Sequence, residues 1–161
     1  MKVQILTTGG TIDKLYFDRK SAYQVGEPQV GELLEEANVT VEYEIKALLH
    51  KDSLDFTDED RQLIVETVRE TPCRHVLITH GTDTMLETAR ALQQVVDKVV
   101  VLTGAIQPAR LRDSDAFFNV GFAFCAVQVL EPGTYVAMNG RIFTPESARK
   151  NVDLGRFEEI A

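Results

Sequence analysis

The stretch that decides the fold is "HVLITHGTDTMLETARALQQVVDKVVVLTG", residues 75–104. Its two apolar ends, "HVLITHG" and "KVVVLTG", have the length and β-branched content of strands, and the second is continuously apolar like a strand buried on both faces. The segment between them predicts an amphipathic helix. Its apolar stripe is formed by Met85, Ala89, Leu92 and Val96. The pattern strand, helix, strand over about 30 residues is typical of a parallel βαβ unit.

The same alternation continues in both directions along the chain. Further strands are predicted at residues 2–8, 39–49 and 134–143, the last with a tight turn at Asn139-Gly140. Further helices are predicted at residues 30–38, 56–70 and 115–130. The pattern predicts one α/β domain over residues 1–161, a doubly wound, mostly parallel open sheet with helices on both faces, flavodoxin-like or Rossmann-like.

Two segments carry more specific expectations. Residues 115–130 are apolar nearly all round, which predicts a buried helix with Cys125 in the core. Residues 12–28 are polar and without sustained periodicity, which predicts a long loop that is either functional or mobile.

Composition limits the class of protein. The chain has 161 residues, a net charge of -8 and a pI near 4.9, and it lacks a basic patch, so a nucleic-acid partner is not expected. No stretch has the length of a membrane span, and the first residues do not resemble a signal peptide. Two cysteines are too few for a disulfide framework and fit a reducing compartment. The expectation is a cytoplasmic protein.

Candidate chemistry gathers where the predicted strands end, because ligands bind at the carboxyl ends of parallel strands in such sheets. A lone glycine pair, a lone Asp83 or a lone Lys150 would mean little, since these are typical of a turn, a helix N-cap and a surface lysine. That all of them are predicted at one edge of the sheet is more informative about a functional site than any single residue. The residues that follow the strands are Gly9, Gly10, Thr11, Ser53, Gly81, Thr82, Asp83, Ala105 and Lys150.

Several kinds of site are not indicated. Neither a GxGxxG nor a GxxxxGK[ST] motif is present, and His50, His75 and His80 lack metal-ligand spacing, so no nucleotide, metal or other cofactor is expected. A hydroxyl nucleophile would then need another base. A desolvated lysine can accept a proton, and a tyrosine on a flexible loop can relay one, which Lys150 and Tyr23 could do. These parts suit attack on a carbonyl group.

At this point a family resemblance becomes clear. The motifs "TGGTI", "SAYQVG", "HGTDTMLETA", "TGAIQP" and "RKNVD" resemble, in order and approximate spacing, those of the bacterial-type L-asparaginases. The resemblance spans nearly the whole chain. It implies hydrolysis of L-asparagine to L-aspartate and ammonia without a cofactor, often with slower action on glutamine.

The resemblance also implies a role for each matching residue. Thr11 would be the nucleophile and Tyr23 its activating group on a flexible lid. Thr82 would position the amide, Lys150 would hold or shuttle a proton, and Asp83 would bind the substrate α-amino group. The remaining matches are substrate-binding positions. Among them Ser53 would bind the α-carboxylate, and its motif matches the family pattern least well. These positions are Gly10, Ser53, Gly81 and Ala105.

The chain also departs from the family pattern. Family members usually carry a second, smaller C-terminal domain, and a neighbouring subunit then completes the substrate site. The chain resembles the N-terminal catalytic half alone, so a homo-oligomer is expected to close the site. Two other functions remain open: a non-catalytic amino-acid-binding module or partner-dependent subunit, and an amidase for another small amide such as L-glutamine.

Overall fold

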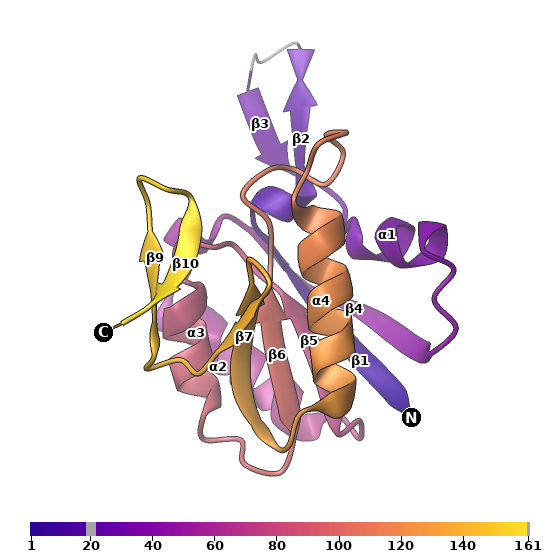
Figure 1. The fold of residues 1–161 in the computed structure, drawn as a ribbon, viewed down its shortest axis with the longest axis vertical. Coiled ribbons are helices and arrows are strands. Elements are labelled where there is room, and N and C mark those ends of the chain that lie inside the picture. Colours follow the sequence, from indigo (N-terminus) through magenta and orange to yellow (C-terminus); the bar gives the residue numbers. More distant parts are fainter. Residues whose placement is uncertain (19–21, 161) are drawn as a thin grey trace.

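A computed structural model describes residues 1–18 and 22–160. Its centre is a six-stranded sheet in the order β4-β1-β5-β6-β7-β8, parallel except for β8, which pairs antiparallel with β7 (Figure 1). The strands are β1 (Lys2–Gly9), β4 (Glu42–Lys51), β5 (His75–Thr79), β6 (Val99–Thr103), β7 (Gly133–Met138) and β8 (Arg141–Phe143). The predicted mostly parallel α/β sheet is therefore confirmed.

The strand order explains the sequence pattern. The inner strands β5 and β6 are buried almost throughout, which is why they are continuously apolar, whereas the outer strand β4 is largely exposed. Counting only the parallel strands, the order is 2-1-3-4-5, that of flavodoxin-like sheets. The chain reverses its direction of winding between β1 and β5, so that point is where such folds place a ligand.

Two helices cover each face of the sheet. The helices are α1 (Val30–Glu36), α2 (Asp58–Glu70), α3 (Met85–Leu92) and α4 (Ala116–Val129). Apolar side chains of α2 and α3 pack into one core cluster, and those of α1 and α4 into a second cluster on the opposite face (Figure 1). Helix α2 begins with a capping box between Thr57 and Asp60, as the sequence spacing indicates. None of the described helices is both long and apolar enough to span a bilayer.

Two helix predictions need correction. Helix α3 ends at Leu92, so Val96 lies beyond it and is 77% exposed instead of completing the apolar stripe. Helix α4 is buried on one side only, because α1 and the sheet cover a single face of it. Cys125 is exposed on the other side, so its expected place in the core is wrong.

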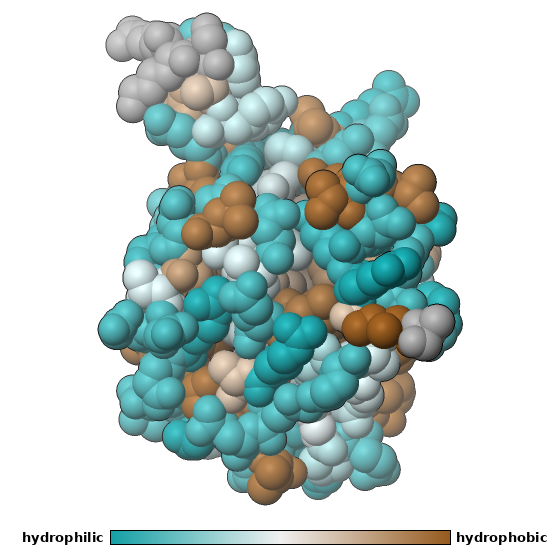
Figure 2. All heavy atoms as spheres, turned by 90° about the vertical axis from the view of Figure 1, so that its left-hand side faces the viewer, coloured by the Kyte–Doolittle hydropathy of each residue, from teal (hydrophilic) through white to brown (hydrophobic). Residues whose placement is uncertain are grey.

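The predicted long loop contains regular structure. Strands β2 (Lys14–Phe17) and β3 (Ala22–Val25) pair as an antiparallel hairpin that projects from the body of the molecule (Figures 1 and 2). Ser21, the first residue of the "SAYQVG" motif, lies outside the described residues. A second hairpin is formed by β9 (Ala148–Asn151) and β10 (Arg156–Glu159). Between β7 and β8, the predicted turn is confirmed, with positive φ at Asn139 and Gly140.

Candidate active site

The turns after β1 and β5 touch at the point where the winding reverses. A Cβ added to Gly10, whose φ is +89°, would lie 2.5 Å from the backbone N and Cα of Gly81. A Cβ added to Gly81 would in turn lie 2.5 Å from the hydroxyl oxygen of Ser53. The Gly81 backbone beside Gly10 and the Ser53 side chain beside Gly81 thus explain both glycines. The same contacts bring the segments that carry Thr11, Thr82 and Ser53 into one place.

This contact predicts a sharp contrast between two glycine substitutions. In Gly10→Ala the new methyl group meets rigid backbone, and the backbone conformation alone costs roughly 1–3 kcal/mol. In Gly121→Ala, inside α4, the methyl group points into open space, and a helix gains about 0.5–1 kcal/mol from the same change. Thermal unfolding should give a lower Tm for the first variant and a higher Tm for the second. Equal shifts would contradict the close packing of the two turns.

A lysine, a threonine and an aspartate form a bonded cluster beside these turns. The Lys150 amine donates to the hydroxyl oxygen of Thr82 at 2.9 Å and to a carboxylate oxygen of Asp83 at 2.6 Å. Thr82 is 6% exposed, and the Lys150 side chain is only 17% exposed, so Lys150 is not an ordinary surface lysine. Nor is Asp83 a helix cap, because α3 has Thr84 as its N-cap residue.

The β9–β10 hairpin is what delivers Lys150 to the cluster. Lys150 pairs across the hairpin with Phe157, whose side chain is buried in the core. The Phe157 N–H donates to the side-chain oxygen of Asn139 at 2.9 Å, and the Asn139 N–H donates to Asn119 of α4 at 3.2 Å. This chain of contacts ties the hairpin to the turn after β7 and so fixes the position of the lysine.

Ser53 lies in a single 3-10 turn, Ser53–Asp55, that follows β4. It is 1% exposed, and its backbone carbonyl accepts a hydrogen bond from the Thr84 hydroxyl at 2.8 Å. The Ser53 hydroxyl oxygen also accepts from the Thr84 N–H at 3.4 Å. Ser53 is therefore packed against the turn after β5.

Ala105 follows β6 and is buried. The preceding Gly104 allows close approach to the β5 end, since an added Cβ would lie 2.3 Å from the carbonyl oxygen of His80. The Gly104 carbonyl accepts from the Asn119 side chain at 3.1 Å, and Asp115 accepts from the backbone N–H groups of Ile106 and Gln107 at 2.9–3.1 Å. The turn that carries Ala105 is thus held by α4 on one side and packs against β5 on the other.

Thr11 and Tyr23 occupy different environments. Thr11 begins a 3-10 turn, Thr11–Asp13, immediately after Gly10 and is half-buried. Tyr23 lies on β3 of the projecting hairpin and is 51% exposed, with its ring 5.4 Å from that of Tyr16. The structure therefore gathers the turns that carry the other predicted residues, and it places Tyr23 on the arm that rises above them (Figure 1).

One supporting residue, His80, was not predicted from the sequence. It is fully buried, with Nδ1 2.7 Å from the Gly81 carbonyl oxygen and Nε2 2.8 Å from the Thr88 hydroxyl. Since a carbonyl only accepts, Nδ1 carries the proton and Nε2 accepts from Thr88. Burial lowers the pKa of His80 to about 4, so the ring is neutral near pH 7. Its place in the "HGTDT" motif was the available signal.

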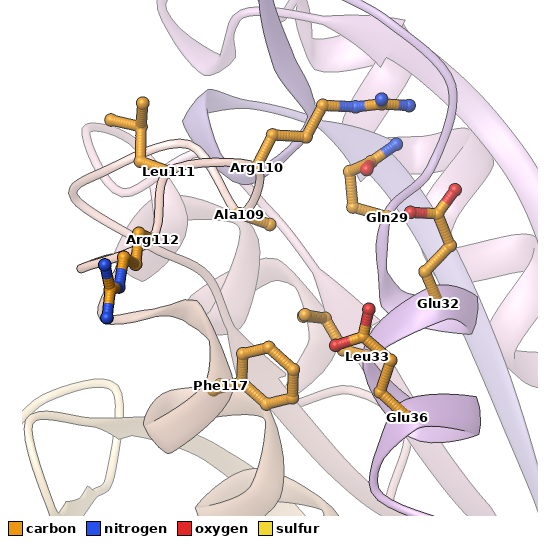
Figure 3. Close-up of a pocket in the computed structure, with 9 residues that line it drawn as sticks. All are labelled: Gln29, Glu32, Leu33, Glu36, Ala109, Arg110, Leu111, Arg112 and Phe117. Atoms are coloured by element: carbon orange, nitrogen blue, oxygen red, sulfur yellow. The ribbon is translucent and has the colours of Figure 1, made fainter.

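A groove of about 370 Å³ lies elsewhere, between α1 and the loop before α4 (Figure 3). Loop residues with Phe117 form one side of it, and Gln29 with residues of α1 forms the other. None of the nine predicted site residues lines this groove. The candidate site lies instead at the sheet edge where the turns converge.

The family can now be stated from comparison with known proteins. Residues 2–156 match the family model described as "Asparaginase, N-terminal". The chain belongs to the asparaginase family. This match covers all the converging turns, from Gly10 to Lys150.

Individual asparaginases show the same relationship. An L-asparaginase of Bacillus licheniformis is 28% identical over 160 residues, which cover 92% of this chain and 49% of that protein. An L-asparaginase of Thermococcus kodakarensis is 32% identical over 170 residues, which cover 99% and 51%. A solved structure of the thermostable L-asparaginase from Thermococcus kodakarensis superposes with a TM-score of 0.87 at 30% identity, and the superposition also covers 99% and 51%.

A relative that is not named an asparaginase is also similar to this chain. A glutamyl-tRNA(Gln) amidotransferase subunit of Methanococcus vannielii is 31% identical over 151 residues, which cover 87% of this chain and 34% of that protein. The chain thus spans about half the length of the asparaginases it matches and about a third of the amidotransferase subunit.

Proposed function

We propose that the protein is an amidohydrolase that converts L-asparagine to L-aspartate and ammonia. The observation that carries the proposal is the cluster in which Lys150 bonds to both Thr82 and Asp83, beside the turn that presents Thr11. Family membership supports the same reaction, because relatives that match nearly the whole chain are named L-asparaginases.

The proposed reaction has two halves. The Thr11 hydroxyl attacks the side-chain amide carbon and its proton is passed to the amide nitrogen, so that the C–N bond breaks, ammonia leaves and an ester to Thr11 remains. Water then attacks the ester, releases aspartate and returns the proton to Thr11. The backbone N–H of Thr82 is suited to stabilise the oxyanion in both halves, whereas the Gly10 N–H already donates to the Lys51 carbonyl at 3.0 Å.

The other residues bind and move protons. Lys150 carries a proton to or from the reacting amide through the Thr82 hydroxyl, to which it already donates. Asp83 binds the α-amino group, and Ser53 with Gly81 binds the α-carboxylate, while the Ala105 backbone faces the amide. Tyr23 serves Thr11 after the β2–β3 hairpin closes over the substrate.

The direct test is ammonia release from the purified protein with saturating L-asparagine, and with L-glutamine in parallel. Release from asparagine, lost in Thr11→Ala, is the expected result. Faster release from glutamine would make glutamine the preferred substrate. The two amides differ by one methylene group, which discriminates between substrates by about 1–3 kcal/mol.

A second candidate is a partner-dependent subunit or amino-acid-binding module. The similarity to an amidotransferase subunit is the observation that favours it. It predicts that calorimetry detects aspartate or asparagine binding while no ammonia appears.

Self-association is part of the proposal. Helix α4 contains no charged residue, yet Phe117, Phe118 and Val129 on its outer side are 47%, 62% and 70% exposed. Apolar surface of this kind marks interaction sites, which supports contact with a second copy. Sedimentation should show a species larger than 18.0 kDa, and a fully active monomer would contradict it. A cytoplasmic location is also proposed, supported by the two free cysteines.

A further inference from the structure

Asp13 closes the root of the β2–β3 hairpin. Its backbone carbonyl accepts from the Gly26 N–H at 2.8 Å, so one residue joins the start of the hairpin to its end. Its carboxylate oxygen Oδ1 accepts from the Gln29 N–H at 2.9 Å, which ties the same point to the residue that precedes α1. Its own N–H donates to the Gly10 carbonyl at 3.2 Å. Asp13 therefore contacts both the Thr11 turn and the arm that carries Tyr23.

The surroundings of this root are fixed. Gln29 is 2% exposed, and its side-chain amide donates to the Glu27 carbonyl at 2.8 Å, so the residue that Asp13 holds is itself anchored. Figure 3 shows Gln29 at the edge of the groove beside α1. On the other side, the Ile12 carbonyl accepts from the Ala109 N–H at 3.0 Å. The outer part of the hairpin is exposed, so its placement depends on these few bonds and on the ion pair between Lys14 of β2 and Asp52 at 2.7 Å.

The Asp13 carboxyl group is unusual because it is buried from solvent. It is 2% exposed, and burial raises its pKa to about 7, although the bond from the Gln29 N–H acts in the opposite direction. The proposed reaction gives this buried carboxyl group no role of its own.

We propose that Asp13 is a positioning residue: its carboxyl group holds Gln29 and its backbone carbonyl holds Gly26, so that together they set the placement of the Tyr23 hairpin relative to Thr11, and protonation of the carboxyl group loosens that placement. The proposal rests on the proposed function only in assigning a use to Tyr23. An ionised carboxylate makes a stronger, charge-assisted bond to the Gln29 N–H than a neutral carboxyl group does, although burying the charge costs the folded state more stability than this bond returns.

Other charged groups near the root of the hairpin also influence the pKa of the Asp13 carboxyl group, but they do not take over its role. His50 on β4 lowers the pKa of Asp13 and Glu27 raises it. The Lys14 amine is engaged by Asp52 at 2.7 Å. On the remaining neighbouring segments, Glu32 of α1 and Arg110 of the loop before α4 are both exposed.

The same carboxyl group links stability to pH. Because the folded-state pKa is raised from 3.8 to about 7, the folded state binds more protons than the unfolded state between these values. The stability that the Asp13 carboxyl group contributes to the folded state is therefore complete below about pH 4 and is lost as the pH rises through about 7. Asp13→Asn keeps the shape and the acceptor oxygen but cannot ionise, so its Tm should rise relative to wild type over this window.

The activity test compares kcat/KM for asparagine in wild type and Asp13→Asn from pH 5.5 to 8.5. The ratio of wild type to variant should rise by about threefold or more, with a midpoint near pH 7, as the charged clamp forms. Asp18→Asn is the matched control, since it makes the same chemical change on the exposed hairpin away from the root, and its ratio should stay flat. A constant ratio for Asp13→Asn would overturn the proposal.

A second measurement does not depend on catalysis. In NMR spectra of the wild type, the amide signals of Gln29 and Tyr23 should both shift with a midpoint near pH 7, and both should stay still in Asp13→Asn. If no ammonia is released, the proposed function fails, and these signals alone decide the role of Asp13. A Gln29 signal that moves while the Tyr23 signal does not would show a local titration without positioning, and would also overturn the proposal.

Discussion

Thr11→Ala is expected to lower the rate of ammonia release from L-asparagine by roughly 10³-fold or more, because loss of a nucleophile removes the covalent route itself. Thr11 is half-buried at the start of a 3-10 turn, and no described hydrogen bond in the core depends on its hydroxyl. The folded state should therefore survive the change. The measurement is kcat by coupled ammonia detection at saturating substrate, with Tm recorded for both proteins.

The control for this prediction keeps the hydroxyl. Thr11→Ser should retain a measurable fraction of the activity, since it removes only a methyl group and still offers an oxygen to the amide. If Thr11→Ala hydrolysed asparagine at a rate within a few-fold of wild type, Thr11 would not be the nucleophile, whatever the effect of the other variants.

The fold could be predicted because local pattern and tertiary environment agree. Residues 75–104 alternate between β-branched runs and a helical stripe, and the structure buries both runs at the centre of the sheet. The predictions for α4 and the polar loop failed for two different reasons. An apolar sequence does not say which side of a helix has a neighbour, and Cys125 faces outward. A short hairpin held mainly at its root leaves little periodicity to detect.

The site was partly predictable. Gly10, Gly81 and Thr82 lie just after the ends of β1 and β5, so the rule that ligands meet the carboxyl ends of parallel strands predicted that they would lie together. Lys150 was predicted as a residue after a strand and as a candidate base, but its grouping with Thr82 and Asp83 came only from the family resemblance. The hairpin that carries it is held through Asn139 and Phe157, contacts distant in the sequence. The buried carboxyl group of Asp13 left no such signal.

Lys150→Met is the second large effect, and it should reduce kcat for asparagine by roughly 10²–10⁴-fold, the usual loss when a positioned proton carrier is removed. Methionine preserves most of the length and apolar volume of the lysine stem. It leaves the buried Thr82 hydroxyl without its donor and the Asp83 carboxylate without its cation. KM should rise as well, since the freed Asp83 is no longer held in the position proposed to bind the α-amino group.

The neighbouring residue supplies the control. Arg149→Met removes a cation one position away on the same strand, where the side chain is 66% exposed and lies 3.5 Å from Glu158, so kcat should stay within about twofold. Lys150→Arg separates charge from proton transfer, because a guanidinium stays protonated in proteins. Activity near wild type in Lys150→Arg would show that the cation acts only by its charge. Low activity in both Lys150 variants, with Arg149→Met unaffected, would identify the amine as the group that moves the proton.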